Sequence, residues 1–203
     1  MSKQTKVTGV VLAGGQARRM NFQDKGLQLF CGKPLISYSL NALRGLVDEI
    51  VINANRNQEL YENFGFRVIG DLTPDFSGAL AGILAMMTKT TADLLLVIPC
   101  DAPFISTLQL QHLLDEHQKN AAEITVACTG EQIHGVFLVV NTNLKTHLEN
   151  YLAMGNHKMQ LWFEAHKTHF VDFSGQHGFE NLNTLEELAH AERVFFELQK
   201  SRQ

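Results

Sequence analysis

Residues 7–20 read VTGVVLAGGQARRM, and this stretch decides the fold class. Its first seven residues form a short apolar run, rich in valine and leucine, in which apolar and polar residues do not alternate strictly. Such a run is typical of a strand that helices cover on both faces of a parallel sheet. Gly14 and Gly15 follow it, and glycines at a strand end let backbone N–H groups approach a phosphate closely. The stretch therefore predicts a buried strand that ends in an anion-binding loop.

Three further apolar runs have the same character, and helical patterns separate them. We expect buried strands at residues 49–53, 67–69 and 93–98. Strand–helix repetition implies right-handed crossovers between parallel strands. The sequence therefore predicts an α/β fold, a mostly parallel twisted sheet with helices on both faces. The helical groups of apolar residues are Ile36, Leu40, Leu43 and Val47; Leu80, Ile83, Leu84 and Met87; and Leu110, Leu113, Leu114 and His117.

The pattern changes after Ala121. Two more strands are expected, at residues 123–128 and 135–140, joined by a turn at Thr129-Gly130, and they could include an antiparallel element. No proline-rich linker, low-complexity tract or internal repeat divides the chain, so we expect a single domain over residues 1–203. The remaining expected elements are helices at residues 143–153, 158–165 and 185–199 and a brief strand at 170–173.

The composition excludes several classes of protein. The chain has 203 residues, of which 45% are apolar and 19% charged, as in a folded protein. Lysine and arginine number 17 against 21 aspartates and glutamates, for a net charge of −4. This balance argues against a nucleic-acid partner or an anionic membrane surface, since both need a basic face. No run approaches the roughly 20 apolar residues of a membrane span.

The cysteines and the N-terminal residues bear on the cellular compartment. The three cysteines, at positions 31, 100 and 128, are widely spaced and odd in number. They exclude a disulfide framework and a cysteine zinc site, and they suit a reducing compartment. The first apolar run faintly resembles a signal peptide, but Thr8 and Gly9 interrupt it and two arginines soon follow. We therefore expect a cytoplasmic protein.

Polar side chains stand where the expected parallel strands end. Asn53 closes the second strand, Asp71 follows the third, and Asp101 follows the fourth within the sequence PCDAP. Ligands of open parallel sheets bind beyond these carboxyl ends. A carboxylate there, on a backbone fixed by prolines, can hold a divalent cation over a triphosphate. Each residue alone could simply begin a turn, but several in succession favour one anionic, metal-bound ligand.

Basic residues near the first strand end could balance the charge of that ligand. Arg18, Arg19 and Lys25 follow the glycine pair closely. The segment is not a GxGxxG motif, and the only Gly-Lys pair precedes a proline, so it is not a P-loop either. The alternative for this segment is an ordinary Gly-Gly turn with surface charges. For Cys100 and Trp162 we expect packing roles rather than chemistry.

Together these motifs resemble those of the molybdenum cofactor guanylyltransferases, within the nucleotidyltransferase superfamily. The motifs are LAGGxxxRM followed by a lysine, NAN, an aspartate after the third strand, GxLAG, PCDxP and a late NxNT. The resemblance extends from Val7 to Leu188. LAGGxxxRM alone identifies the superfamily, whereas the combination with NAN, PCD and NLNT is more specific. LAGG favours guanylyl transfer, because related cytidylyltransferases usually have LAAG.

The sequence departs from the family pattern at three points. Asn21-Phe22 replace the glycine pair that usually follows RM, so the loop near the triphosphate is expected to differ in shape. Residues 78–82 read GALAG and lack the proline of the usual GPLAG. His134-Gly135 replaces the usual His-Pro.

The resemblance implies a role for each matching residue. It makes Arg19, Lys25 and Asp101 the catalytic group, with Arg19 and Lys25 on the nucleotide phosphates and Asp101 on Mg²⁺. Asn53 and Asp71 lie near the guanine and the ribose. The remaining binding residues are Leu12, Ala13, Gly14 and Gly15, which line the nucleotide; Gly78 and Gly82, which shape the cleft wall; and Asn181 and Asn183, which belong to the molybdopterin side.

The implied reaction is the transfer of GMP from GTP to molybdenum-molybdopterin, with release of pyrophosphate. GTP and molybdenum-molybdopterin are the expected partners, with molybdoenzyme maturation proteins as further ones, and we expect a monomer. A nucleotide-binding half is expected at about residues 7–110 and an acceptor-binding half at about 120–190. Three alternatives stay open. The first is a nucleotidyltransferase with another nucleotide or acceptor, such as CTP with molybdopterin or a sugar phosphate, and the second is a non-catalytic GTP-binding module. The third is a nicotinamide- or flavin-dependent oxidoreductase, against which the missing GxGxxG motif counts.

Overall fold

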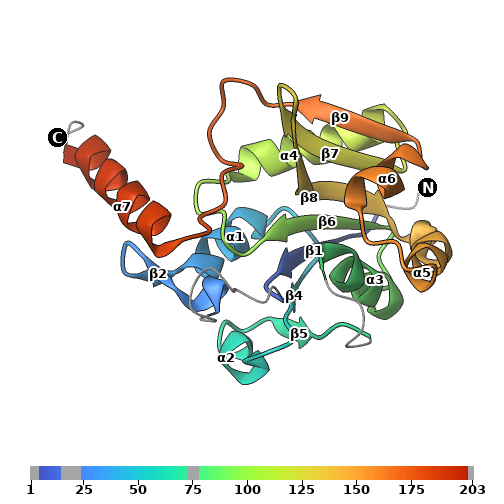
Figure 1. Cartoon of the computed structure of the whole chain (residues 1–203), viewed down its shortest axis with the longest axis horizontal. Coiled ribbons are helices and arrows are strands. Elements are labelled where there is room, and N and C mark those ends of the chain that lie inside the picture. The colour runs from blue at the N-terminus through green and yellow to red at the C-terminus, as the bar shows by residue number, and fades with distance from the viewer. Residues whose placement is uncertain (1–4, 15–23, 73–77, 201–203) are drawn as a thin grey trace.

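The computed structural model describes residues 5–14, 24–72 and 78–200 (Figure 1). Its strands are β1 (Val7–Leu12), β2 (Leu29–Phe30), β3 (Lys33–Pro34), β4 (Glu49–Asn53), β5 (Arg67–Ile69), β6 (Leu94–Pro99), β7 (Ile124–Thr129), β8 (Gln132–Asn141) and β9 (Thr168–Asp172). Its α-helices are α1 (Leu35–Leu43), α2 (Gln58–Glu62), α3 (Ala79–Lys89), α4 (Thr107–Lys119), α5 (Lys145–Ala153), α6 (Met159–Glu164) and α7 (Leu185–Lys200). Two 3₁₀ turns, η2 (Lys25–Leu27) and η3 (Thr142–Leu144), complete the described elements.

A seven-stranded sheet runs through the centre, in the order β5-β4-β1-β6-β8-β7-β9. The strands β5, β4, β1 and β6 are parallel to one another. The strand β8 is antiparallel to both of its neighbours, and β9 is parallel to β7. A separate antiparallel ribbon joins β2 to β3. The carboxyl ends of the four parallel strands consequently lie along one edge.

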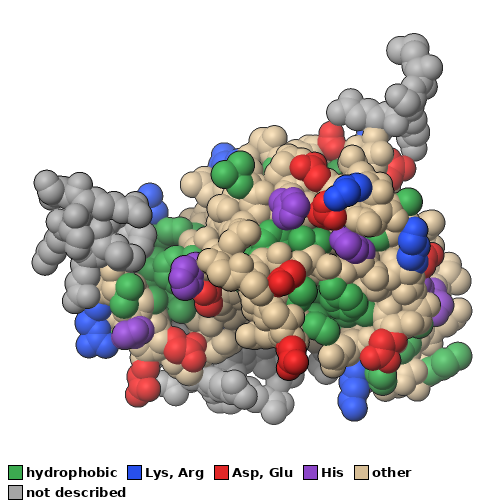
Figure 2. All heavy atoms as spheres, turned by 90° about the horizontal axis from the view of Figure 1, so that it is seen from above, with side chains coloured by type: hydrophobic (Ala, Val, Ile, Leu, Met, Phe, Trp, Pro, Cys, Tyr) green, Lys and Arg blue, Asp and Glu red, His purple; other side chains and the backbone are tan. Residues whose placement is uncertain are grey.

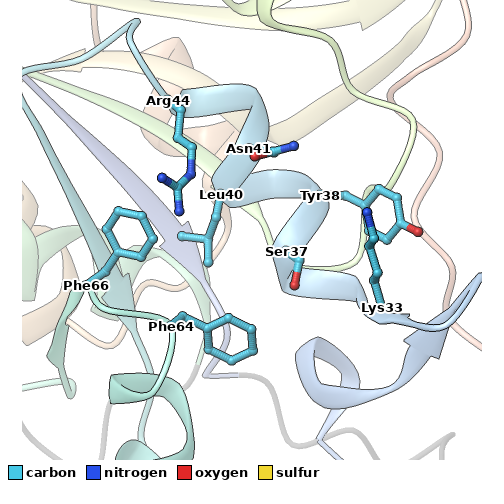
Figure 3. A pocket seen from close by; sticks show the side chains of 8 residues that line it. All are labelled: Lys33, Ser37, Tyr38, Leu40, Asn41, Arg44, Phe64 and Phe66. Atoms are coloured by element: carbon cyan, nitrogen blue, oxygen red, sulfur yellow. The ribbon is translucent and has the colours of Figure 1, made fainter.

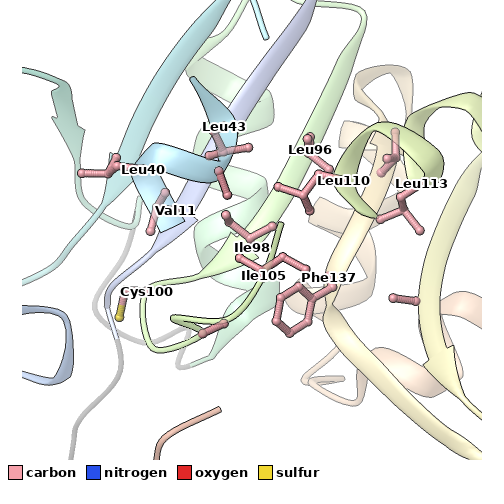
Figure 4. Packing of buried hydrophobic residues seen from close by; sticks show 14 of the residues in the cluster. Val11, Leu40, Leu43, Leu96, Ile98, Cys100, Ile105, Leu110, Leu113 and Phe137 are labelled. Carbon is pink, nitrogen blue, oxygen red and sulfur yellow. The ribbon is translucent and has the colours of Figure 1, made fainter. Parts of the chain in front are cut away.

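Two apolar layers sandwich this sheet. On one face, Leu40 of α1 and Leu110 of α4 belong to the same buried cluster as Val11 of β1 (Figure 4). On the other face, Leu84 of α3 packs in a second cluster with Val10, the neighbour of Val11, and with residues of α5 and α6. Adjacent strand residues point to opposite faces, so both faces of β1 and β6 are covered. This double burial explains the near-continuous apolar runs in the sequence.

The predicted α/β fold is confirmed, with small shifts at the ends of the elements. The strand β8 is the antiparallel element, and it lies between β6 and β7. The turn that precedes it is displaced by one residue, because Thr129 pairs with Gln132 and leaves Gly130 and Glu131 as the loop. The sequence pattern does not reveal β2, β3 or α2, which are too short to show a period.

The segment that follows β9 returns across the end of β6. The backbone N–H of Leu182 donates to the carbonyl oxygen of Asp101 at 2.9 Å. The side chain of Leu182 is buried with Leu188, Phe30 and Leu35 in a third apolar cluster. The helix α7 then lies at the outer side of the molecule, next to the β2–β3 ribbon (Figure 1). The late part of the chain therefore contacts the strand end that carries Asp101.

The surface on the β9 side is mixed in charge. Figure 2 shows acidic and basic side chains interspersed there with histidines, rather than gathered into patches of one sign. Within the described ranges, no helix combines the length and the apolar character that crossing a bilayer requires.

Candidate functional site

The carboxyl ends of β1, β4 and β6 lie side by side, as the parallel arrangement predicts. Leu12 is in register with Asn53 on one side and with Pro99 on the other. The backbone N–H of Ala13 donates to the Asn53 carbonyl oxygen at 2.8 Å, and that of Cys100 donates to the Leu12 carbonyl oxygen at 3.1 Å. The residues that follow these strands consequently meet around the end of β1.

Two asparagines of the NAN motif hold the carboxylate of Asp71. Asn53 Nδ2 donates to Asp71 Oδ1 at 3.0 Å, and Asn55 Nδ2 donates to Asp71 Oδ2 at 2.7 Å. The backbone N–H of Asp71 donates in turn to Asn55 Oδ1 at 2.7 Å. Asn53 is buried, whereas Asp71 and Asn55 are partly or fully exposed. The carboxylate is therefore oriented by the protein and still accessible to a ligand.

Glycines make room for this polar cluster. A Cβ atom on Gly82 of α3 would lie 2.3 Å from Asn53 Oδ1, closer than any side chain allows. A Cβ atom on Gly14 would lie 3.2 Å from Asn55 Nδ2. Gly78, which caps α3, has φ +112° and ψ 178°, a conformation that is essentially restricted to glycine. Gly82 therefore leaves the space that Asn53 occupies, and Gly78 allows the backbone conformation at which α3 begins.

A second polar group joins three distant parts of the chain. Lys25 Nζ donates to Asp101 Oδ2 at 3.1 Å and to Asn183 Oδ1 at 2.7 Å. The Asp101 side chain is 8% exposed and that of Lys25 is 24% exposed, so this ion pair is partly shielded from water. The structure thus brings together two of the three predicted catalytic residues. It also places Asn183 beside the proposed phosphate-binding lysine.

The surroundings of Asp101 show whether its carboxylate could bind the Mg²⁺ ion that the family resemblance implies. Burial raises the pKa of the Asp101 carboxyl above its ordinary value, and the Lys25 ammonium opposes this shift. Among the described residues, no three His, Cys, Asp or Glu side chains are grouped so that they could hold a metal ion. Mg²⁺ is usually bound through one or two carboxylates together with substrate phosphates and water. Asp101 therefore fits a Mg²⁺ ion that arrives with a nucleotide.

The segment that carries Asn181 and Asn183 is fixed by local hydrogen bonds. Asn183 Nδ2 donates to the Asn181 carbonyl oxygen at 3.1 Å, and the backbone N–H of Asn183 donates to Glu187 Oε2 at 2.6 Å. The N–H of Glu187 donates to Thr184 Oγ1 at 3.1 Å, which caps α7. Asn181 Oδ1 is buried and has no hydrogen-bond donor in the described part of the structure. Such an acceptor is suited to a donor supplied by a ligand.

The structure says less about the roles of the remaining residues that the sequence singles out. Leu12 is partly buried, and Ala13 belongs to the buried cluster of α1 and α4. Gly15 and Arg19 lie outside the described residues. Cys100 is buried, as expected for a packing residue, and burial raises the pKa of its thiol well above the ordinary value. Trp162 is completely buried and is likewise a core residue.

A pocket of about 210 Å³ lies elsewhere, on the outer side of α1 (Figure 3). Leu40, Phe64 and Phe66 give it an apolar lining, and the Arg44 guanidinium lies 5.3 Å from the centroid of the Phe66 ring. None of the predicted site residues lines it. The predicted site at the strand ends therefore lies apart from this pocket.

Comparison with known proteins identifies the family. The model of the MobA-like NTP transferase domain matches residues 9–170. The chain belongs to this family. A molybdenum cofactor guanylyltransferase of Shewanella amazonensis is 42% identical to this MobA-like transferase over 184 residues, which cover 90% of the chain and 94% of the relative. One from Haemophilus influenzae is 41% identical over 183 residues, covering 90% and 95%.

Solved structures show the same fold. The molybdopterin-guanine dinucleotide biosynthesis protein A from Archaeoglobus fulgidus superposes with a TM-score of 0.77 at 21% identity, covering 94% of this chain and 99% of that one. A nucleotidyl transferase from Methanothermobacter superposes with a TM-score of 0.75 at 19% identity. The family model and the curated relatives, rather than these structures, confirm the resemblance seen in the motifs: this MobA-like transferase is a nucleotidyltransferase of the molybdenum cofactor guanylyltransferase family.

Two contacts in the site cannot be predicted from the sequence motifs. The sequence places Asn55 within NAN but does not show that it holds Asp71. Lys25 and Asn183 are 158 residues apart, so no local spacing in the sequence predicts their contact. The two residues do lie in recognisable motifs, Asp24-Lys25-Gly26 and Asn181-Leu182-Asn183, but neither motif indicates that they meet.

Proposed function

We propose that this MobA-like transferase transfers GMP from GTP to the terminal phosphate of molybdenum-molybdopterin. A phosphate oxygen of the acceptor attacks the α-phosphorus of GTP and forms the new P–O bond. The bond between the α-phosphorus and its bridging oxygen breaks, and pyrophosphate leaves with the electron pair. The nucleophile is already an anion, so catalysis requires positioning and charge neutralisation rather than a strong base.

The observation that carries this proposal is the Lys25–Asp101–Asn183 group at the end of β6. Lys25 Nζ lies 3.1 Å from Asp101 Oδ2, so a cation for phosphate oxygens and a carboxylate for a metal ion occupy one place. Lys25 would stabilise the negative charge that develops on the departing pyrophosphate. Asp101 would hold Mg²⁺, which when bound neutralises charge on the triphosphate and polarises the α-phosphoryl group. The role of Arg19 on the phosphates rests on the family resemblance.

The Asn53–Asn55–Asp71 cluster is proposed to bind the nucleoside. A carboxylate can accept from the N1–H and N2–H₂ edge of guanine, which adenine and cytosine do not present. The same carboxylate could instead accept from the ribose hydroxyls. Both roles agree with an Asp71 that two asparagine amides orient and that stays partly exposed. The cluster lies on the β4 side of the β1 end, whereas Lys25 and Asp101 lie on its β6 side.

The acceptor is proposed to bind near the segment after β9. Asn181 Oδ1, for which the described residues provide no donor, offers an acceptor, and a pterin ring carries donors that match it. Asn183 connects this segment to Lys25 and therefore lies between the proposed nucleotide and acceptor sides. We further propose that the chain acts as one domain, as a monomer in the cytoplasm.

A variant of Asp101 tests the catalytic assignment. Asp101→Asn should lower the rate of pyrophosphate release at least about 100-fold, the scale of losing one strong electrostatic stabiliser, and leave the circular dichroism spectrum unchanged. Asp115→Asn, which changes an exposed aspartate on α4, is the matched control and should retain the wild-type rate. Near-normal turnover by Asp101→Asn would remove the metal-binding role.

A substrate panel tests the choice of nucleotide and acceptor. The assay measures pyrophosphate release from each of the four nucleoside triphosphates with Mg²⁺, with and without molybdenum-molybdopterin. We expect release from GTP only when the acceptor is present. Equal release from CTP, or release with a sugar phosphate in place of molybdopterin, would favour the alternative transferases. GTP binding without any product would favour a binding module.

A further inference from the structure

The buried hydroxyl of Tyr61 lies against the two neighbours of Lys25 in the chain, Asp24 and Gly26. The Tyr61 hydroxyl of α2 donates to Asp24 Oδ1 at 2.5 Å, and Asn57 Nδ2 donates to Asp24 Oδ2 at 3.2 Å. Tyr61 is 0% exposed and Asp24 is 7% exposed. Asp24 directly precedes Lys25, so the carboxylate that receives these two hydrogen bonds anchors the chain at the entrance to η2.

The residue after Lys25 packs against the same hydroxyl. A Cβ atom on Gly26 would lie 2.7 Å from Tyr61 Oη and 3.3 Å from Cys100 Sγ, so only a glycine lets the backbone approach this closely. The turn itself is closed by the N–H of Leu27, which donates to the Asp24 carbonyl oxygen at 3.2 Å. The backbone of Lys25 is therefore held from both sides by contacts that converge on Tyr61.

A fixed backbone matters for lysine because its side chain is long and flexible. The ammonium group is attached through four flexible methylene groups. Its position therefore depends on where the backbone of Lys25 lies and on the contacts that Nζ makes. Here Nζ must reach both Asp101 and Asn183, which lie on different segments. A catalytic group that is displaced by about 1 Å can lose a large part of its effect.

We propose that Tyr61 is a positioning residue for catalysis: its hydroxyl holds Asp24 by a hydrogen bond and lies against Gly26, and this fixes the backbone from which Lys25 reaches the reacting phosphates. This inference rests on the role of Lys25 in the proposed function. Tyr61 itself does not touch the substrate, because it is buried beneath the turn. A simply structural role would make the aromatic ring important for packing and the hydroxyl important for stability alone.

A double-mutant cycle separates these two roles, with pyrophosphate release from GTP and molybdenum-molybdopterin as the readout. Tyr61→Phe keeps the ring and removes only the hydroxyl. In the wild-type background we expect kcat to fall roughly tenfold with a smaller change in the KM for GTP, as for the loss of an orienting interaction. In a Lys25→Ala background the same substitution should change kcat by less than about twofold, because the group that it positions is absent.

Tyr151→Phe is the matched control, since it deletes a hydroxyl that donates to the Lys158 carbonyl oxygen at 2.8 Å on the distant helix α5. It should retain the wild-type kcat. Should Tyr61→Phe fail to fold, Asn57→Gly takes its place in the cycle, because it removes the other donor to Asp24 and glycine accepts the left-handed φ of +51° at this position.

The outcomes distinguish this inference from the proposed function. A Lys25→Ala variant with a wild-type rate would overturn the role of Lys25 and the inference with it. A strong Lys25→Ala defect combined with an equal Tyr61→Phe loss in both backgrounds would leave the proposed function intact and overturn the positioning role. Loss of the Tyr61→Phe effect in the Lys25→Ala background supports it.

Discussion

Replacing Gly82 with alanine tests how tightly the nucleoside side of the site is built. The new Cβ atom would lie 2.3 Å from Asn53 Oδ1 and 3.0 Å from Leu12 Cδ2. The leucine contact involves the end of a flexible side chain, which can shift. Asn53 cannot move freely, because its Nδ2 donates to the Ile69 carbonyl oxygen at 3.1 Å and to Asp71 Oδ1 at 3.0 Å. The substitution must therefore displace Asn53 from Asp71.

Three contributions determine how much Gly82→Ala should change the free energy of unfolding. Overpacking a buried position costs about 1–3 kcal/mol, and the lost hydrogen bond to Asp71 costs about 1 kcal/mol more. Alanine is favoured over glycine inside a helix by about 1 kcal/mol, which offsets part of this cost. We expect Gly82→Ala to lower the free energy of unfolding by about 2 kcal/mol. We also expect weaker GTP binding, because Asp71 loses one of its two orienting amides.

Urea denaturation and calorimetric titration with GTP measure these two effects. The Asn53→Ala background provides the control, since the atom that clashes is then gone. There Gly82→Ala should be neutral or stabilise the protein by up to about 1 kcal/mol. A loss of about 2 kcal/mol in both backgrounds, or a gain in stability in the wild type, would refute the proposed clash with Asn53.

Four further predictions concern other parts of the site and the core. Asp71→Asn should reduce the preference for GTP over ATP in equilibrium binding, whereas an equal loss for both nucleotides would indicate a ribose role. Lys25→Ala should weaken the binding of GTP more than that of GMP, which lacks the β- and γ-phosphates; equal losses would contradict its contact with the distal phosphates. Asn181→Ala should leave GTP affinity unchanged in calorimetry and raise the KM for molybdopterin, and the reverse pattern would place it on the nucleotide side. Burial lowers the pKa of His117, so below about pH 6.5 the unfolded chain binds a proton that the folded chain does not, and the free energy of unfolding should fall as the pH drops from 7.5 to 5.5; His117→Gln should flatten this dependence in denaturation curves, and an unchanged slope would exclude His117 as a cause.

The architecture is predictable from the sequence where local pattern determines it. The runs at β1, β4 and β6 are apolar because helices cover both of their faces, and this burial leaves a direct trace in the composition. The meeting of Asn53 and Asp71 follows as well, since parallel strands end along one edge. The insertion of β8 between β6 and β7 does not follow, because strand order depends on pairing between distant residues.

Parts of the site cannot be predicted from the sequence, because they depend on a short helix and on contacts between distant residues. The helix α2 has only five residues and begins after Asn57 in a left-handed conformation, so it offers no period to detect. Its Tyr61 meets Asp24, which lies 37 residues earlier, inside the core. Lys25 and Asn183 are joined by the path of the segment after β9, and that path is set by the burial of Leu182 rather than by spacing.

The contact between Lys25 and Asn183 also orders the assembly of the enzyme in time. The two residues are 158 positions apart, so at a synthesis rate of about 5–20 residues per second Asn183 is added roughly 8–32 s after Lys25. The sheet from β5 to β6 could pair during that interval, with Lys25 already beside Asp101. The nascent chain would then hold an ion pair without its third member, and transferase activity would appear only when the segment around Leu182 closes over the strand end.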